Sequence, residues 1–384
     1  MNFNFDQIIN RRNTSSLKYD FAEKYGRPKD ALPLWVADMD FAVAPAITEV
    51  IQNYANHAIY GYTESDVDYF SAVQNWFVTQ HNVQIEKDWI VKTPGVTFAV
   101  GMAIKAFTEV GDAVLIQKPL YYPIENTIVA NSRKLIDNSL LYEDGRYAID
   151  FADFEEKIIQ HKVKMFILCN PHNPVGRVWT LAELQEMSRI CKKYNCLVVS
   201  DEVHCDLIFG QHKHIVYSTI DENSVILTAP SKTFNIAGLQ VSNAFIPDIN
   251  LREKFAHEIS ATGYSQLNTM GIIAATAAYK YGLEWLNELL EYLGKNVAFV
   301  TDFFAANLPQ VHVVHLEGTY LMWLDFNALG ISHQQMQEKF DGVKLWLSSG
   351  AIFGDTGNGF WRMNIACPQA TLKDALERIL LCLK

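Results

Sequence analysis

The sequence predicts an α/β protein with a large domain, built on a mostly parallel, doubly wound sheet, and a smaller α+β domain. Short apolar runs alternate with amphipathic helices, which is typical of a parallel sheet covered on both faces. This alternation stops near residue 283, where the pattern of one long helix begins. The chain has 384 residues, more than the roughly 250–300 that a single core supports, so two domains are expected.

Five apolar runs are the expected strands of the large sheet: Trp89–Val91, Ala113–Ile116, Met165–Cys169, Leu197–Ser200 and Val225–Thr228. Two helices between them are indicated by apolar residues three or four positions apart, which share one face: Val100, Ile104 and Phe107 in the first, and Leu184, Met187 and Cys191 in the second. A Thr180…Glu183 capping box begins the second of these helices.

The smaller domain is expected to follow a long helix whose apolar residues recur at helical spacing from Leu286 to Phe304. Two strands, Tyr320–Asp325 and Phe360–Ile365, come next, and then a helix from Leu372 to Leu383 that Thr371…Asp374 begins. We therefore divide the chain into an N-terminal segment, 1–45, that contributes to the small domain and the functional site, a large ligand-binding domain, 46–283, and a small domain, 284–384.

Composition excludes several classes of function. The net charge is −11 and the pI is near 5.5, without a dense Lys/Arg tract, so a nucleic-acid backbone is not an expected partner. The start, Met1 to Asn13, lacks the apolar centre of a signal peptide, and no apolar stretch reaches the ~18 residues of a membrane helix. Six scattered cysteines suit reduced thiols. We expect a cytoplasmic protein with no membrane partner.

A lysine directly follows one expected strand. Lys232 lies after Val225–Thr228, in a loop at the strand's carboxyl end, where open α/β sheets bind ligands. Pro230, Phe234 and Ile236 are candidates for the walls of a partly apolar pocket, in which desolvation keeps the amine available as a nucleophile. The alternative is an exposed surface lysine, but this position favours a lysine that forms a Schiff base with an aldehyde cofactor.

An acid ends the neighbouring expected strand, in the segment Ser200-Asp201-Glu202-Val203-His204. A carboxylate there can pair with the ring nitrogen of a bound pyridine and keep it charged. The charged ring then accepts the electrons released when a bond at a substrate Cα breaks. Asp201 could instead cap a helix or turn. The catalytic interpretation of Asp201 depends on that of Lys232.

Three further loops follow expected strands. Asn173, in Asn170-Pro171-His172-Asn173-Pro174, could donate a hydrogen bond to a phenolic oxygen on the ring, although an Asn-Pro pair alone indicates only a turn. Gly95 and Val96 begin a helix whose N–H groups suit a phosphate, to which Ser231 could add a hydroxyl, and an ordinary turn is the alternative. Tyr121 could stack on the ring or belong to the core.

In the expected strand Phe360–Ile365, alternation places Arg362 opposite the apolar side chains. Its guanidinium could hold a substrate α-carboxylate through two hydrogen bonds, or form a structural salt bridge. His204, Cys205, His212 and His214 lie within eleven positions, but their spacing matches no structural-zinc pattern. We expect no metal.

These segments together resemble the fold-type I pyridoxal-phosphate enzymes of the class I/II aminotransferase superfamily, most closely the PatB/MalY-type C–S β-lyases, which are cystathionine β-lyase-like. The resemblance covers nearly the whole chain. Its motifs are Asn170–Arg177, Ser200–His204, Ser231–Gly238 and Arg362–Pro368, and the lyase branch is indicated by Leu34–Phe41 and Tyr60–Thr63.

The resemblance implies pyridoxal 5′-phosphate as cofactor and a homodimer with active sites at the subunit interface. It implies that Tyr62 reaches the partner's cofactor phosphate, that Trp35 lies near the substrate, and that His204 stands where many aminotransferases have a tyrosine near the ring oxygen. The expected reaction is α,β-elimination of L-cystathionine or a related cysteine thioether, with Lys232 as general base. The alternatives are an aminotransferase and, from another class, a catalytically silent interaction protein with this fold.

Overall fold

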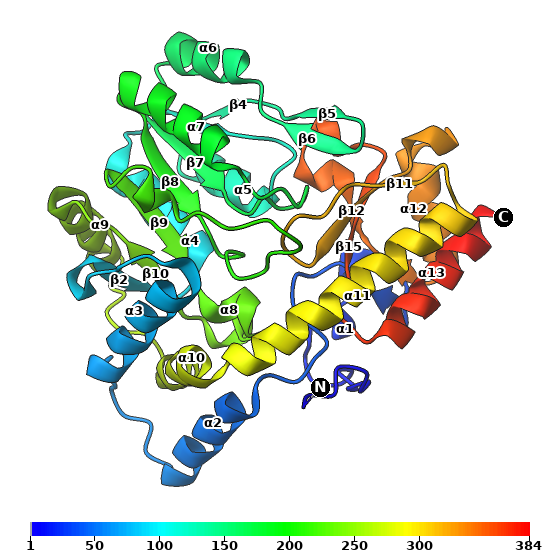
Figure 1. Cartoon of the computed structure of the whole chain (residues 1–384), viewed down its shortest axis with the longest axis horizontal. Helices are drawn as coiled ribbons and strands as arrows, with labels where there is room; N and C mark the ends of the chain where they lie inside the picture. Colours follow the sequence, from blue (N-terminus) through cyan, green and yellow to red (C-terminus); the bar gives the residue numbers. More distant parts are fainter. Residues whose placement is uncertain (1) are drawn as a thin grey trace.

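The computed structural model describes residues 2–384 and is built around a seven-stranded sheet in the order β2–β10–β9–β8–β7–β3–β4 (Figure 1). All neighbours are parallel except β10, which runs antiparallel to both β2 and β9. Consequently β2 points the same way as the other five. The strands are β2 (Ile90–Thr93), β3 (Ala113–Ile116), β4 (Lys134–Asp137), β7 (Met165–Cys169), β8 (Leu197–Asp201), β9 (Ser224–Thr228) and β10 (Ser242–Phe245).

Each face of this sheet packs against its own set of helices, because successive side chains of a strand point to opposite faces. In β3, Val114 and Ile116 join one apolar cluster with α4 (Val96–Phe107), α5 (Tyr122–Ala130) and α9 (Ile249–Ala261). Ala113 and Leu115 join the other cluster, with α3 (Val67–His81), α6 (Phe151–His161), α7 (Leu181–Lys193) and α10 (Thr269–Tyr281). The doubly wound fold expected from the sequence is confirmed.

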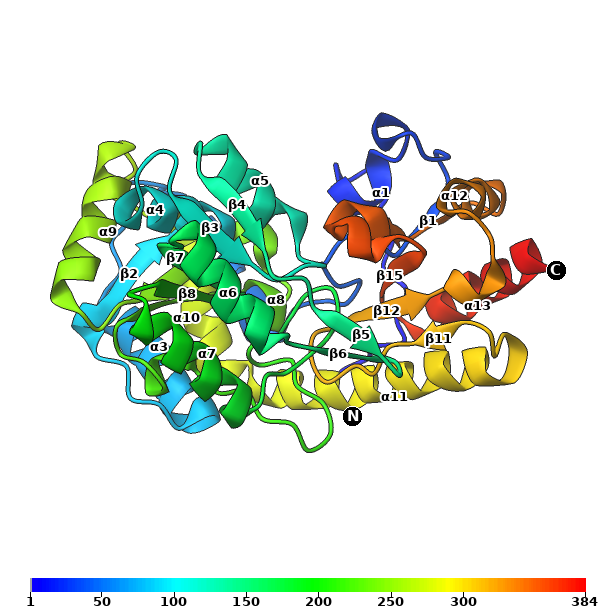
Figure 2. The ribbon, with the colours of Figure 1, turned by 90° about the horizontal axis from the view of Figure 1, so that it is seen from above.

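The second part of the molecule holds an antiparallel sheet in the order β11–β12–β15–β14, which lies to the right in Figure 2. Its strands are β11 (His312–Val313), β12 (Leu321–Asp325), β15 (Phe360–Asn364) and β14 (Ser348–Ser349), and α12 (His333–Gly342) and α13 (Gln369–Leu383) pack beside them. The start of the chain joins this part, because β1 (Leu32–Pro33) pairs with β13 (Leu345–Trp346).

The helix α11 (Leu283–Asn307) runs along both parts as one continuous element (Figures 1 and 2). It begins within one residue of the predicted boundary 283/284. The predicted domains 1–45, 46–283 and 284–384 themselves stay predictions. The helix α2 (Pro45–His57) follows the N-terminal segment and packs on α10.

Most expected elements are present, and one helix start was wrong. The capping box of Thr180 and Glu183 forms at the start of α7. The last helix, however, begins at Gln369 and not behind Thr371, since Pro368 turns the chain into the first turn and its carbonyl accepts the Thr371 N–H at 2.8 Å. Sequence reasoning also missed β4 and β10.

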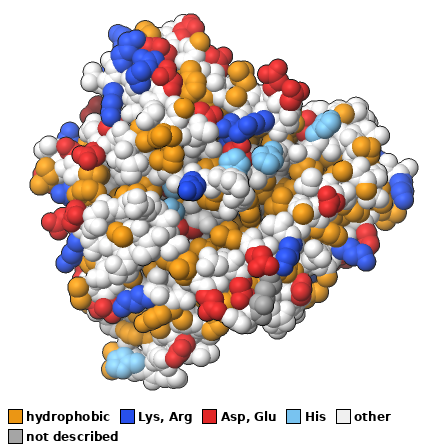
Figure 3. Space-filling model, in the orientation of Figure 1, with side chains coloured by type: hydrophobic (Ala, Val, Ile, Leu, Met, Phe, Trp, Pro, Cys, Tyr) orange, Lys and Arg blue, Asp and Glu red, His pale blue; other side chains and the backbone are white. Residues whose placement is uncertain are grey.

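The surface carries both signs of charge, with basic and acidic side chains interspersed on the face shown in Figure 3. Within residues 2–384, no helix combines the length and the apolar character needed to cross a membrane.

A buried cluster of ion pairs holds the N-terminal segment in place. Lys18 is fully buried, and its Nζ lies 2.8 Å from Oδ2 of Asp40. Arg11 donates to Asp40 Oδ1 at 2.7 Å and to Asp38 Oδ2 at 2.6 Å. Tyr19 also donates to Asp40, at 3.1 Å. Because both carboxylates are paired with cations, the segment that carries them can stay buried beside the sheet edge.

We predict that Lys18→Met lowers the free energy of unfolding by about 3 kcal/mol, since it leaves the Asp40 carboxylate buried with a weaker set of partners. Thermal denaturation followed by circular dichroism measures this as a lower melting temperature. The double variant Lys18→Met/Asp40→Asn should recover part of the loss, and the exposed Lys24→Met serves as the control. An unchanged melting temperature for Lys18→Met would contradict the role of this cluster.

Candidate active site

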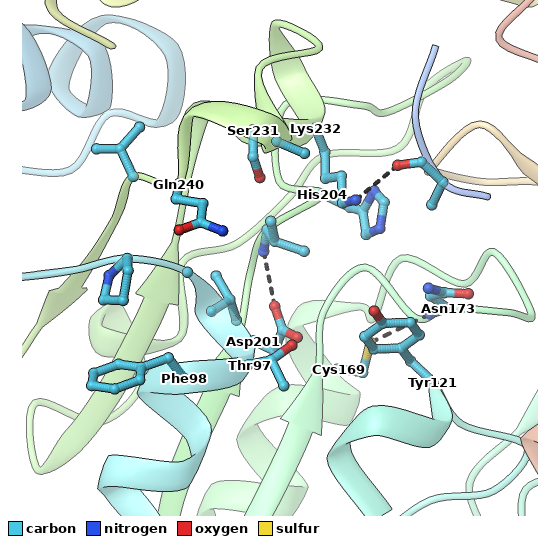
Figure 4. Close-up of a pocket in the computed structure, with 17 residues that line it drawn as sticks. Thr97, Phe98, Tyr121, Cys169, Asn173, Asp201, His204, Ser231, Lys232 and Gln240 are labelled. Carbon is cyan, nitrogen blue, oxygen red and sulfur yellow. Dashed lines mark hydrogen bonds between the residues drawn. The ribbon is translucent and has the colours of Figure 1, made fainter. Parts of the chain in front are cut away.

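The carboxyl ends of β2, β3, β7, β8 and β9 meet at one edge of the large sheet, and the segments after them enclose a pocket of about 200 Å³ (Figure 4). The pocket brings together eight of the residues that the sequence singled out: Gly95, Val96, Tyr121, Asn173, Asp201, His204, Ser231 and Lys232. We call it the cofactor pocket.

Lys232 stands on α8 (Pro230–Thr233), a single helical turn directly after β9. Its Nζ donates a hydrogen bond to the Ala37 carbonyl at 2.8 Å, as the dashed line in Figure 4 shows. Burial lowers the pKa of this amine to about 8, although the nearby carboxylates of Asp38 and Asp201 raise it. About a tenth of the amine is therefore neutral and nucleophilic at pH 7, far more than for a lysine with an ordinary pKa. The expected wall residues Pro230, Phe234 and Ile236 are buried but do not line the pocket, whose apolar side chains include Val96, Phe98, Val203 and Val241 instead.

Asp201 is the last residue of β8 and is buried. Its Oδ1 accepts the Val203 N–H at 3.2 Å, so Oδ2 remains for a donor within the pocket. Burial raises the pKa of this carboxyl to about 6, against the charge of Lys232, which lowers it. An N–H donor that carries a positive charge would stabilise its ionised form.

The start of α4 faces the same pocket through Gly95, Val96 and Thr97. No side chain of the described residues caps this helix, so its first N–H groups can bind an anion, aided by the helix dipole. Ser231 and Gln240 line the pocket as well and offer a hydroxyl and an amide. This end of the cofactor pocket suits a phosphate.

Arg362 joins the small part of the molecule to the cofactor pocket. It lies in β15 and is 5% exposed. Nη1 donates to Oδ1 of Asn173 at 2.8 Å, and Nη2 donates to the Trp35 carbonyl at 2.8 Å. Its Nε is buried and makes no hydrogen bond within residues 2–384. An unpaired guanidinium N–H at this place suits a carboxylate of the substrate.

The rings of Tyr121 and His204 complete the wall of the pocket (Figure 4). Burial lowers the pKa of His204 well below its usual value, helped by the charges of Lys232 and Arg362, so its imidazole is neutral. Its Nδ1 is buried and has no hydrogen-bond partner in the described chain. Burial also raises the pKa of Tyr121, although Arg362 opposes this, so the phenol keeps its proton.

Three predicted site residues do not line the cofactor pocket: Arg362, which contacts it through Asn173, Tyr62 and Trp35. The side chain of Tyr62 is 99% exposed, in the segment between α2 and α3. Trp35 lines a neighbouring cleft and reaches the site through its carbonyl, which accepts from Arg362. His204, Cys205, His212 and His214 do not converge among the described residues, since His214 pairs with Glu202 at 2.8 Å and His212 lies beside His315.

Sequence reasoning missed several residues of the pocket. Cys169 ends β7 and lines the pocket, and its Sγ accepts the Asn173 N–H at 3.4 Å. Burial raises the pKa of its thiol, which therefore keeps its proton. Its place at the end of an expected strand was a usable signal. Gln240 has a left-handed backbone, with φ of 49°, in a loop without a recognisable motif. Ala37 contributes a carbonyl, which no side-chain pattern reveals.

The pocket fits pyridoxal 5′-phosphate on its own geometry. A buried amine stands ready for the aldehyde, the free oxygen of Asp201 suits the ring N–H, and the uncapped start of α4 suits the phosphate. These three groups come from three different strand ends, and each lacks a partner that the cofactor would supply.

Known proteins share this architecture. The model of the family described as aminotransferase class I and II matches residues 29–379. Cystathionine beta-lyase PatB of Bacillus subtilis is 42% identical over 381 residues, 98% of each chain. Cystalysin of Treponema denticola, solved with a pyridoxal 5′-phosphate cofactor, has a TM-score of 0.96 at 38% identity and covers 100% of this chain and 99% of its own. A PLP-bound C–S lyase from Staphylococcus hominis has a TM-score of 0.93 at 29% identity, with 100% and 98% covered. The chain belongs to the aminotransferase class I and II family.

Proposed function

We propose that this protein is a pyridoxal-phosphate-dependent carbon–sulfur β-lyase. It cleaves L-cystathionine or related cysteine thioethers by α,β-elimination to a thiol, which is homocysteine for cystathionine, with pyruvate and ammonia. The observation that carries the proposal is the buried amine of Lys232, with its pKa lowered to about 8, in one pocket with the carboxylate of Asp201. Full-length similarity to a cystathionine beta-lyase supports the reaction.

When bound, pyridoxal phosphate supplies an electron sink for the electron pair released at the substrate Cα. Lys232 would hold the cofactor through its Nζ, and the same Nζ would then accept the Cα proton of the substrate. Asp201 would keep the proton on the ring nitrogen. Asn173 and His204 would bind the oxygen side of the ring, Tyr121 would stack on its face, and Gly95, Val96 and Ser231 would bind the phosphate.

Arg362 orients the substrate. Its guanidinium would bind the α-carboxylate, to which the unpaired Nε–H is available as a donor. The Cα–H bond breaks with its proton moving to Lys232, and the sulfur leaves Cβ with the bonding electron pair as a thiolate. One water then hydrolyses the three-carbon fragment to pyruvate and ammonia, so the atoms balance.

The same residues could serve transamination, in which the proton returns to the cofactor and no sulfur leaves. Similarity to lyases over nearly the full length of the chain favours elimination. A catalytically silent interaction protein is disfavoured because the chain retains Lys232, Asp201, Asn173 and Arg362 in contact or within one pocket.

The assembly that we propose is a homodimer with active sites at its interface. Tyr62 is 99% exposed and lies near two other exposed apolar side chains, Ile59 and Tyr60, which suits burial by a second copy. In the dimer, Tyr62 binds the phosphate of the partner's cofactor. The cysteines form no disulfide among residues 2–384, which fits the cytoplasmic location that we propose.

Wild-type protein should show a visible absorbance band with pyridoxal phosphate and release pyruvate from L-cystathionine in a coupled lactate dehydrogenase assay, without an added keto acid. Lys232→Ala should lose at least about 1000-fold in kcat, because it removes both the attachment point and the base. The exposed Lys254→Ala is the control. An active Lys232→Ala protein, or turnover that requires a keto acid, would contradict the lyase.

The rate at which the apoprotein takes up pyridoxal phosphate should rise about tenfold per pH unit below pH 8 and level off above it, since only the neutral amine attacks the aldehyde. The inflection follows from the pKa of Lys232, lowered to about 8. Stopped-flow absorbance between pH 6.5 and 9.5 measures it. A rate that still rises at the upper end would indicate an ordinary exposed lysine.

Tyr62→Phe should weaken cofactor binding by roughly tenfold, because it removes one hydrogen bond to a charged group. Fluorescence titration of the apoprotein gives the dissociation constant, and analytical ultracentrifugation should report a dimer for both proteins. The nearby Tyr60→Phe is the matched control. A monomer, or equal affinity in both variants, would rule out this role for Tyr62.

A further inference from the structure

A buried carboxylate lies behind the turn that carries Lys232. Asp206 stands in the loop after β8, a few positions beyond Asp201, and its side chain is 5% exposed. Its Oδ2 accepts the hydroxyl of Thr233 at 2.7 Å. Thr233 is fully buried and directly follows Lys232 in α8. Asp206 thus joins the strand end that carries one residue of the site to the turn that carries the other.

The other oxygen of this carboxylate is bound by α3. Oδ1 accepts the indole N–H of Trp76 at 3.0 Å, and Nε2 of His81 lies 2.8 Å from it. Burial raises the pKa of Asp206, but hydrogen bonds from His81, Thr233 and Trp76 outweigh this effect and hold the pKa below its ordinary value. The carboxylate is therefore ionised, and its donors come from two helices, α3 and α8.

A second buried pair of a histidine and a carboxylate lies next to the first. Nε2 of His214 lies 2.8 Å from Oε2 of Glu202, which directly follows Asp201. Strand alternation turns the Glu202 side chain away from the face on which Asp201 meets the cofactor pocket. The rings of His81 and His214 meet edge to face, with centroids 5.6 Å apart. The residues that follow Asp201 and Lys232 in the sequence therefore both belong to one buried polar group.

The turn α8 has few hydrogen-bonding restraints of its own. It is four residues long and has no side-chain cap, and a single helical turn is not stable by itself in water. Within residues 2–384 its side chains make two hydrogen bonds, from Lys232 to the Ala37 carbonyl and from Thr233 to Asp206. The first is made by the reacting amine, so it cannot fix the turn while that amine reacts. The bond from Thr233 remains.

We propose that Asp206 is a positioning residue for the reaction: through Thr233 it fixes the turn that carries Lys232 relative to Asp201. It thereby sets the place from which the amine takes the substrate proton. Neither Asp206 nor Thr233 lines the cofactor pocket, so the effect acts through Lys232. Apolar groups often stabilise a core as well as a buried charge does, but short bonds to a carboxylate fix one geometry. This inference rests on the proposed lyase function.

The test compares Thr233→Val with Thr233→Ser. Valine keeps the shape of threonine and removes the donor to Asp206, whereas serine keeps the hydroxyl. With L-cystathionine and the holoenzyme, Thr233→Val should lower kcat about tenfold and leave KM within about twofold. A displaced base slows proton transfer, while the carboxylate site at Arg362 stays intact. Thr233→Ser should keep kcat within about twofold of the wild type.

Uptake of pyridoxal phosphate by the apoprotein supplies a readout that needs no turnover. At pH 8, stopped-flow absorbance should give a rate about fivefold lower for Thr233→Val and unchanged for Thr233→Ser, because the same amine attacks the aldehyde. The matched control is Thr219→Val, which removes a hydroxyl bonded to the Val216 carbonyl at 2.8 Å, outside the pocket. Its kcat and uptake rate should stay within about twofold of the wild type.

A further variant guards against a folding defect in Thr233→Val. His81→Gln changes the partner on α3, leaves α8 untouched, and should lower kcat about threefold at unchanged KM. A lower melting temperature with unchanged kcat and uptake rate in both variants, or an equal loss of kcat in Thr233→Ser, would overturn the inference. If the wild type releases no pyruvate from L-cystathionine, the proposed function fails, and the uptake rates alone decide whether Asp206 positions Lys232.

Discussion

The register of the parallel strands fixes the positions of the loops that follow them and of the polar side chains at their ends. Cys169 pairs with Asp201 across β7 and β8, and Asp201 pairs with Leu227 across β8 and β9. Because hydrogen-bonded strands cannot slide past one another, the loops after them open into one space. A shift of one residue would turn the Asp201 side chain to the other face of the sheet. The pairing of the backbones thus determines how the polar side chains at the strand ends lie relative to one another.

Much of the fold could be predicted because its buried strands are apolar and short. β3 and β7 have the expected bounds, since nothing polar interrupts their runs. β10 was missed because Ser242 and Asn243 break its apolar pattern, and only the structure shows that the Ser242 hydroxyl pairs with Thr93 and that Oδ1 of Asn243 accepts from the hydroxyl of Tyr69. β4 lies at the edge of the sheet, where a partly polar strand is tolerated and leaves a weak signal.

The site was predictable where a polar residue follows an apolar run, as Asp201 and Lys232 do. It was not predictable where the partner lies far along the chain. Arg362 binds Asn173 although the two lie 189 positions apart in the sequence. Strand alternation could only indicate which side of β15 Arg362 occupies. The Ala37 carbonyl beside Lys232 is a backbone group, which every residue has, so its role depends on how the N-terminal segment packs.

The unbroken helix α11 couples the two parts of the molecule mechanically. Its 25 residues form a rod about 37 Å long that belongs to both parts, so the small sheet cannot tilt without moving the whole rod. The start of this helix is tightly packed, because a Cβ at Gly282 would lie 2.4 Å from Cε1 of Phe234, too close for any side chain. Phe234 is two residues from Lys232. The continuous helix therefore links the small sheet mechanically to the turn that carries the reactive lysine.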